Sequence, residues 1–321
     1  MHVWRKMVSF VHWNGIGHGG WRKISHNKFF TQFSGMSTRT LYVTDLDGTL
    51  LGADSCISAR SRQMINDLVE RGVMITPATA RTPATVQLLF DGVRQSVYRD
   101  EAGELRPLPA IVMTGAGMWD RETVRFESCR LIPEEDAMRI RDTFDRESLR
   151  PFVYCLSGDN FLNVYHSSKM TRRENAFYQD RRHLELKRFH LDQTPSRWDR
   201  VVLFFAIGPE GTVTKVSEEL GRATECASAW YPDIVLPDTG LMDIYAPGVS
   251  KAHAVSELAA RVGADRVVVF GDNLNDLPMM EVADVAVAMG NALPDVKAKA
   301  DVVIGLNTED AVAEFIMKCE S

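Results

Sequence analysis

Short apolar runs separated by amphipathic segments dominate the chain from residue 38 onward. Between the runs, apolar residues recur at helical spacing, as in residues 58–72, where Ser58 is the predicted N-cap and Gly72 the predicted stop. Strands that alternate with helices predict an α/β fold with a doubly wound parallel sheet. The runs that are short enough to be buried strands cover residues 41–44, 73–76, 110–114, 266–270, 285–289 and 301–304.

The pattern changes between about residues 121 and 237, where strand and helix segments no longer alternate regularly. We interpret this stretch as an inserted α+β cap domain with its own sheet. The core, residues 38–120 and 238–321, is then expected to resume with a strand at 241–245. The helices predicted in the insert cover residues 133–147, 169–183 and 211–221, and the strands 152–156, 161–166 and 201–207.

Residues 1–37 form an extension of different composition. Residues 1–36 hold five Lys or Arg, no Asp or Glu, and four of the eight histidines. A signal peptide needs an uninterrupted apolar segment, which His12, Trp13 and the glycines break. Met36 lies just before the first core strand. We therefore expect residues 1–35 to be a disordered tail or an upstream translation artefact rather than a targeting segment.

Composition excludes several classes of protein. The net charge of −6 argues against general binding to nucleic acid or to a membrane surface, and no apolar run approaches the ~20 residues of a membrane helix. The cysteines are scattered without a CxxC pair, which favours a cytoplasmic protein with neither a disulfide framework nor a zinc site. No oligomeric state is specified. The five cysteines are Cys56, Cys129, Cys155, Cys226 and Cys319.

The first core strand ends in two carboxylates one residue apart, Asp45 and Asp47, followed by Gly48. Residues two apart in a strand point to the same side, so both side chains can converge on one small volume. Two like charges this close require a cation between them or one protonated carboxyl group. Gly48 allows the backbone to turn. An Asx-rich turn at a helix start is the alternative interpretation.

Residues 45–50 (DLDGTL) resemble the first motif of the haloacid dehalogenase superfamily, whose members are mostly phosphatases with an aspartate nucleophile and Mg²⁺. Residues 78–81 (ATAR) resemble the second motif, 248–251 (GVSK) the third, and 271–279 (GDNLNDLPM) the fourth. The form of the fourth motif, with more than a hundred residues between the second and third, is similar to the Cof-type hydrolases, which carry a large cap there.

The resemblance implies a role for each acidic residue. Asp45 would be the nucleophile, and Asp47 would protonate the leaving group and then deprotonate water, while its backbone carbonyl binds the metal. Asp272 would supply a further carboxylate, and Asp276 would orient Lys251 or a metal-bound water. Hard oxygen ligands and a phosphate favour Mg²⁺. The predicted metal site therefore comprises Asp45, Asp47, Asp272 and Asp276.

The resemblance also implies how a phosphoryl group would be held. Thr79 would bind a phosphoryl oxygen through its hydroxyl, aided by the backbone N–H of Ala80, and Lys251 would balance the negative charge. Glycine is usual in the family at position 80 and common at position 252, where this chain has alanine. Alanine would cost about 1 kcal/mol if position 80 required a positive φ. The predicted substrate-binding residues are Thr79, Ala80, Arg81, Lys251 and Asn275.

These features predict a phosphatase that acts on a small phosphorylated metabolite, with a sugar phosphate as the favoured substrate class. A phosphomutase or other phosphotransferase and a non-catalytic metabolite-binding regulator are the alternatives. Residues 169–200 carry nine Lys or Arg against five Asp or Glu, which indicates either a solvated helix face or a basic cap surface that steers phosphorylated substrates. Side chains that either set specificity or fill the cap core are Tyr154, Phe161, Tyr165, His166 and Trp198.

Overall fold

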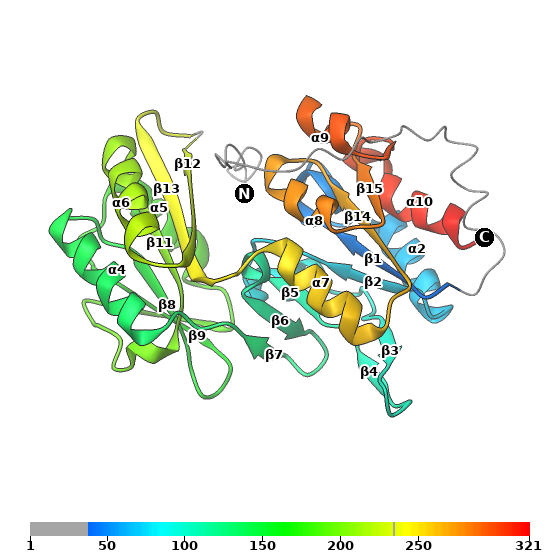
Figure 1. Ribbon diagram of the computed structural model, residues 1–321, viewed down its shortest axis with the longest axis horizontal. Coiled ribbons are helices and arrows are strands. Elements are labelled where there is room, and N and C mark those ends of the chain that lie inside the picture. Colours follow the sequence, from blue (N-terminus) through cyan, green and yellow to red (C-terminus); the bar gives the residue numbers. More distant parts are fainter. Residues whose placement is uncertain (1–37, 234) are drawn as a thin grey trace.

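The computed structural model describes residues 38–233 and 235–321, so the expectation for residues 1–35 lies outside the described part. Figure 1 shows two lobes, joined through β7 (Arg125–Cys129) and through the segment between β13 (Thr239–Pro247) and α7 (Lys251–Val262). We call residues 38–129 and 248–321 the core lobe and residues 130–247 the cap lobe. No helix in the described residues is long and apolar enough to cross a membrane.

The core lobe is built on a parallel sheet. β1 lies between β14 and β2, and its Val43 pairs with Val269 of β14 and with Thr76 of β2. All of β1 is buried, as expected for a central strand covered by helices on both faces. The strands, in sheet order, are β16 (Val302–Val303), β15 (Val285–Ala288), β14 (Arg266–Gly271), β1 (Thr40–Thr44) and β2 (Met74–Pro77).

Helices cover this sheet, and the expected doubly wound α/β class is confirmed. Helix α2 packs against α10, and α7 packs against α8. Ser58 caps α2 as predicted, because its Oγ accepts a hydrogen bond from the backbone N–H of Ser61 at 2.9 Å. The helices of the core lobe are α2 (Ala59–Glu70), α3 (Pro83–Leu89), α7, α8 (Leu277–Glu281), α9 (Pro294–Lys299) and α10 (Ala311–Cys319).

The cap lobe is a six-stranded, mostly antiparallel sheet with helices α4 (Glu134–Arg146), α5 (Arg172–Arg181) and α6 (Glu210–Ala223). Aromatic side chains fill the space between sheet and helices: Phe144 of α4 lies 6.1 Å from Phe204, centroid to centroid. The strands, in sheet order, are β10 (Lys187–Leu191), β9 (Leu162–His166), β8 (Phe152–Leu156), β11 (Val201–Pro209), β13 and β12 (Cys226–Pro232).

The expectation that the core resumes with residues 241–245 is wrong. These residues belong to β13, which lies in the cap sheet between β11 and β12; Asp243 faces Phe205 on one side and Ala229 on the other. The sequence analysis did not predict β12, which pairs antiparallel with β13. An apolar run has the same pattern in either sheet, because burial on both faces does not identify the neighbouring strands.

The apolar run at 110–114 was expected to be a strand of the parallel sheet, but it lies in a separate antiparallel sheet. β5 (Ala110–Val112) pairs antiparallel with β6 (Gly117–Asp120), and β6 pairs antiparallel with β7. A single parallel bridge between Ala78 and Ile111 connects this small sheet to the end of β2. A separate hairpin, β3 (Val97–Arg99) and β4 (Leu105–Pro107), completes the core lobe.

Candidate active site

A cavity of about 780 Å³ lies between the lobes and is lined from both sides. On the core side it is lined where parallel strands end: Asp45 follows β1, Thr79 follows β2, and Asp272 follows β14. The carboxyl ends of parallel strands meet at one edge of the sheet, where ligands of open α/β sheets bind. Residues from three distant segments of the chain therefore converge on one site.

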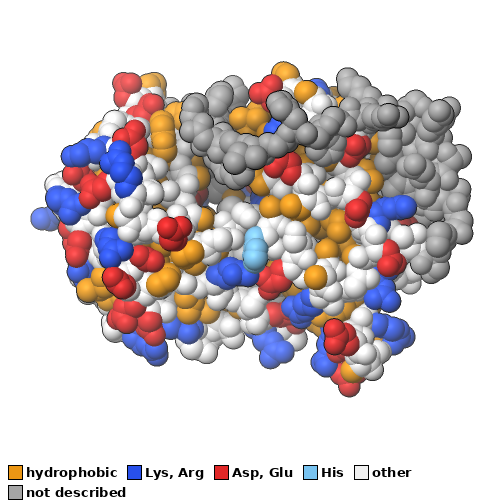
Figure 2. Space-filling view, in the orientation of Figure 1, with side chains coloured by type: hydrophobic (Ala, Val, Ile, Leu, Met, Phe, Trp, Pro, Cys, Tyr) orange, Lys and Arg blue, Asp and Glu red, His pale blue; other side chains and the backbone are white. Residues whose placement is uncertain are grey.

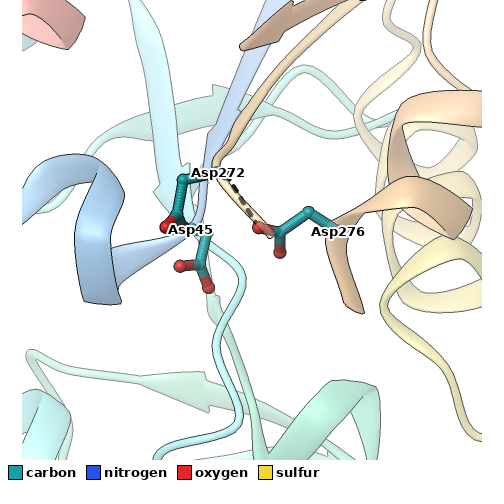
Figure 3. Close-up of side chains that lie close together, drawn as sticks. All are labelled: Asp45, Asp272 and Asp276. Atoms are coloured by element: carbon teal, nitrogen blue, oxygen red, sulfur yellow. Dashed lines mark hydrogen bonds between the residues drawn. The ribbon is translucent and has the colours of Figure 1, made fainter. Parts of the chain in front are cut away.

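Asp45, Asp272 and Asp276 form an acidic cluster (Figure 3), and the first two line this cavity. One carboxylate oxygen from each lies within 4.8 Å of the others. Asp276 is fully buried, and its Oδ2 accepts hydrogen bonds from the backbone N–H groups of Asp272 at 3.1 Å and of Asn273 at 3.2 Å. These bonds hold Asp276 against the loop after β14.

Lys251 reaches the cluster from the first turn of α7. Its side chain is 2% exposed, and its Nζ donates hydrogen bonds to Asp45 Oδ1 at 2.5 Å and to Asp276 Oδ1 at 2.8 Å. Ser250 begins the helix, because its Oγ accepts from the backbone N–H of His253 at 3.0 Å. This N-cap hydrogen bond fixes where α7 begins and therefore where Lys251 enters the site.

One ammonium does not balance three carboxylates. Burial and the neighbouring Asp276 raise the pKa of Asp45 well above its usual range, although Lys251 acts in the opposite direction. Burial and Asp276 likewise raise the pKa of Asp272 to about 7. Burial acts to lower the pKa of Lys251, but Asp276 and Asp45 outweigh it and raise that pKa. A cluster of hard oxygen donors with excess negative charge fits a divalent cation such as Mg²⁺.

Asp47 lies beside this cluster and is held by Arg81. Arg81 Nε donates to Asp47 Oδ2 at 2.8 Å, and Nη2 donates to Oδ1 at 2.6 Å, which is the bidentate geometry of a strong guanidinium–carboxylate pair. Arg81 was predicted to bind substrate, and that stays a prediction. Its ion pair with Asp47 was not predicted from the sequence. The contribution of Asp47 to a metal site depends on its backbone carbonyl and stays a prediction.

Thr79, Ala80 and Asn275 all line the cavity. Thr79 is buried, and its Oγ accepts from the backbone N–H of Arg81 at 3.1 Å, which leaves its own O–H to donate. The residues with positive φ in the described ranges do not include Ala80, so alanine causes no strain there. Asn275 Oδ1 is buried and has no hydrogen-bond partner within the described residues. A donor from a ligand would satisfy this atom.

Gly48 lies directly against Asp272. Its φ is +79°, and a Cβ at this position would lie 2.4 Å from Asp272 Oδ2. The sequence predicted a glycine turn here, but only the structure shows that a side chain would displace a member of the acidic cluster.

We expect Gly48→Ala to lower the free energy of unfolding by about 2–4 kcal/mol, the sum of strain at positive φ and a steric clash. Gly72→Ala is the matched control, because Gly72 has φ +85° and no atom within 4 Å of the added Cβ. The control should cost only about 1 kcal/mol. Urea unfolding of both variants measures the difference. Equal losses would show that Asp272 moves aside without cost.

The cap side of the cavity is formed mainly by polar and charged side chains. Tyr231 Oη donates to Asp243 Oδ2 at 3.1 Å, and burial raises the pKa of Asp243 to about 7. Sequence reasoning missed most of this surface, although alternate residues of one strand, such as Asp243 and Tyr245, share a face. The polar and charged residues of the cap lobe that line the cavity are Tyr154, Arg181, Lys187, Tyr231, Asp243 and Tyr245.

Five cap side chains were predicted either to set specificity or to fill the cap core. Among the described residues that line the cavity, Tyr154 is present and the other four are not. Tyr165 stacks on His190 with centroids 4.9 Å apart, and Trp198 stacks on Phe204 at 6.4 Å. The guanidinium of Arg188 covers the ring of Phe161 at 4.1 Å. His166 is buried, and its ring centroid lies 3.8 Å from that of Phe152.

The chain is similar in sequence to two phosphatases. It is 26% identical over 292 residues to the pyridoxal phosphate phosphatase YbhA of Escherichia coli, covering 88% of this chain and 98% of that protein. It is 26% identical over 280 residues to the 5-amino-6-(5-phospho-D-ribitylamino)uracil phosphatase YcsE of Bacillus subtilis, covering 86% and 94%.

A solved structure and a family match extend this relationship. The crystal structure of a haloacid dehalogenase-like hydrolase from Bacteroides thetaiotaomicron has the same fold, with a TM-score of 0.66, 22% identity, and coverage of 87% of this chain and 98% of that one. Residues 42–316 match the haloacid dehalogenase-like hydrolase family, so the chain belongs to this family, as the four motifs indicated.

Proposed function

We propose that this hydrolase is a Mg²⁺-dependent phosphatase that releases inorganic phosphate from a small phosphate ester of the sugar-phosphate class. The observation that carries the proposal is the carboxylate of Asp45, which lines the cavity and is held by Lys251 within an acidic cluster. The names of the two relatives, both phosphatases of small phosphate esters, support the phosphatase part of this proposal.

In the proposed reaction, an oxygen of Asp45 attacks the phosphorus, and the bond from phosphorus to the leaving oxygen breaks. Asp47 gives a proton to the leaving alkoxide. Water then attacks the aspartyl-phosphate and loses a proton to Asp47, which restores both carboxyl groups and releases phosphate. Arg81 orients Asp47 through hydrogen bonds to both carboxylate oxygens, and one of these bonds would open when that oxygen takes up the proton.

The remaining residues of the site would stabilise the phosphoryl group. The hydroxyl of Thr79 and the backbone N–H of Ala80 would donate to its oxygens, the amide of Asn275 would contact the group or its loop, and Lys251 would balance its charge. Bound Mg²⁺ would screen the repulsion between two anions. Its ligands would come from Asp45, Asp272, the loop held by Asp276, and the carbonyl of Asp47.

The first test is release of phosphate from p-nitrophenyl phosphate, sugar phosphates and nucleotides, with Mg²⁺ and with EDTA. We expect release with Mg²⁺ and none with EDTA. Isomerised sugar phosphates without free phosphate would instead indicate a phosphotransferase. Ligand affinity without any turnover across the panel would indicate a binding protein.

Binding of Mg²⁺ should also be visible without turnover. A ligand at 100 times its dissociation constant stabilises the native state by about 2.7 kcal/mol, so Mg²⁺ should raise the melting temperature of the substrate-free protein. Asp272→Asn should remove most of this rise, because it removes a carboxylate of the cluster. Asp91→Asn, at an exposed position, is the control and should keep it. An equal rise in all three proteins would place the ion elsewhere.

A further inference from the structure

The basic stretch at residues 169–200 does not form one surface. Most of its Lys and Arg side chains are exposed, and several are paired with acids, such as Arg188 with Asp159 and Arg197 with Asp199. On the face seen in Figure 2, acidic and basic side chains are interspersed over the described part of the cap lobe. Two members of the stretch, Arg181 and Lys187, are buried instead and line the cavity.

Lys187 is the more unusual of the two. It begins β10 at the edge of the cap sheet and is only 8% exposed. Its Nζ lies 5.7 Å from the centroid of the Tyr154 ring. Within residues 38–233 and 235–321, no hydrogen-bond acceptor or carboxylate contacts this ammonium. A buried cation is costly unless it is paired.

The neighbouring groups increase this cost. The guanidinium of Arg181 lies 3.9 Å from the ring centroid of Phe177, and its Nη1 donates to the carbonyl of Phe177 at 3.1 Å. Burial, with the nearby charge of Arg181 adding to it, lowers the pKa of Lys187 to about 7. The cap side of the cavity therefore holds two basic groups close enough to repel each other.

One acid shares this side of the cavity. Asp243 accepts from Tyr231 Oη at 3.1 Å, and no ion pair joins it to Lys187 in the described structure. The tyrosines of the cap side, such as Tyr154 and Tyr245, are neutral, because burial raises their pKa values. Among the described residues, Lys187 therefore has no acidic partner, whereas Arg181 lies 4.0 Å from a carboxylate oxygen of Asp180.

We propose that Lys187 binds a second anionic group, a carboxylate or a phosphate, on the leaving group of the substrate. This inference rests on the proposed phosphatase function, in which the first phosphate is held by the core lobe at Asp45 and Thr79. An anion beside Lys187 compensates the buried ammonium and favours its protonated form. A neutral hydroxyl accepts a hydrogen bond but supplies no compensating charge, so acidic phosphate esters should be preferred over neutral ones.

A purely structural role for Lys187, packing its ammonium on the ring of Tyr154, is the competing explanation. The two explanations differ in what they predict for ligands. Packing alone affects stability but does not distinguish an acidic ester from a neutral one. A binding role makes the selectivity depend on the charge at position 187.

The test measures inhibition constants of matched esters against hydrolysis of p-nitrophenyl phosphate. One pair is 6-phosphogluconate and glucitol 6-phosphate, two acyclic esters that differ in a carboxylate; the other is fructose 1,6-bisphosphate and fructose 6-phosphate, which differ in a phosphate. The wild type should bind the acidic member of one pair roughly tenfold to hundredfold more tightly, the range of a charged hydrogen bond. The pair that shows the preference identifies the anion.

Three variants complete the test. Lys187→Met should bring the ratio of inhibition constants close to one, and Lys187→Arg should retain a preference because it retains the charge. Lys169→Met, at an exposed position of the same basic stretch, is the control and should keep the wild-type ratio. A ratio near one in both pairs of the wild type, no inhibition by any of the four esters, or a ratio that Lys187→Met does not change would overturn the inference.

Failure of the inference is distinguishable from failure of the proposed function. If the wild type releases p-nitrophenolate with Mg²⁺ but shows no preference for acidic esters, only the role of Lys187 is wrong. If it releases none, the phosphatase assignment is wrong and the inference falls with it. Melting temperatures of all variants identify any loss of fold.

Discussion

Asp45→Asn should lower phosphate release by on the order of 10⁴-fold or more, because an amide oxygen is a poor nucleophile and no other group of the site replaces it. The substitution keeps the size and shape of the side chain. It also removes a buried negative charge that repels Asp276, so the fold should survive. The measurement is single-turnover phosphate release with Mg²⁺ at saturation.

The control for this prediction separates loss of the proposed nucleophile from loss of the proposed metal site. Loss of activity in Asp272→Asn should be partly restored by raising the Mg²⁺ concentration, because that variant weakens ion binding. Asp45→Asn should show no recovery at any concentration. Wild-type activity in Asp45→Asn, with the unfolding transition unchanged, would assign the nucleophile to another group.

Lys251→Met should lower the free energy of unfolding by about 3–5 kcal/mol, the usual result of removing one partner from a buried ion pair. The ammonium is 2% exposed and is hydrogen-bonded to both Asp45 and Asp276, so its removal leaves two buried carboxylates facing each other. Urea unfolding in EDTA measures the effect without a contribution from bound metal. Turnover should also fall, since the charge on the phosphoryl group is no longer balanced.

A second substitution tests the cause of this loss. Asp276→Asn in the Lys251→Met background should restore part of the stability, because it removes one of the repelling carboxylates, and the coupling should be of the order of 0.5–3 kcal/mol. Lys215→Met is the surface control: Lys215 pairs with Glu147 but is 63% exposed, and its loss should cost less than about 1 kcal/mol. Equal losses for Lys251→Met and Lys215→Met would contradict this interpretation.

The core lobe and its side of the cavity were largely predictable from sequence. β1 and β14 are apolar runs that end in acidic residues, and strand ends meet at one edge of a parallel sheet, so the proximity of Asp45 and Asp272 follows from local pattern. The ion pair between Asp47 and Arg81 did not follow, because it depends on rotamers within the assembled loops.

The cap side was not predictable in the same way. Lys187 and Arg181 belong to a basic stretch that charge counting treats as one surface. Their burial depends on how β10 pairs in the cap sheet and on where α5 packs in the cap lobe, which charge counting does not predict. The sheet to which residues 241–245 belong was also undetermined, because an apolar strand acquires its neighbours only through tertiary pairing.

The place of β13 in the cap sheet has a consequence for protein engineering and for recombination between relatives. A chimera that exchanges residues 121–237 would keep β13, and with it Asp243 and Tyr245, from this chain while replacing β11 and β12, the strands on either side of it. Of the nine cap-lobe residues that line the cavity, two would then come from this chain and seven from the other parent. An exchange that extends to residue 247 transfers the whole sheet and ends four residues before Lys251, so the cap side of the cavity is inherited as one block while Lys251, which we propose for the reaction, stays with its own core.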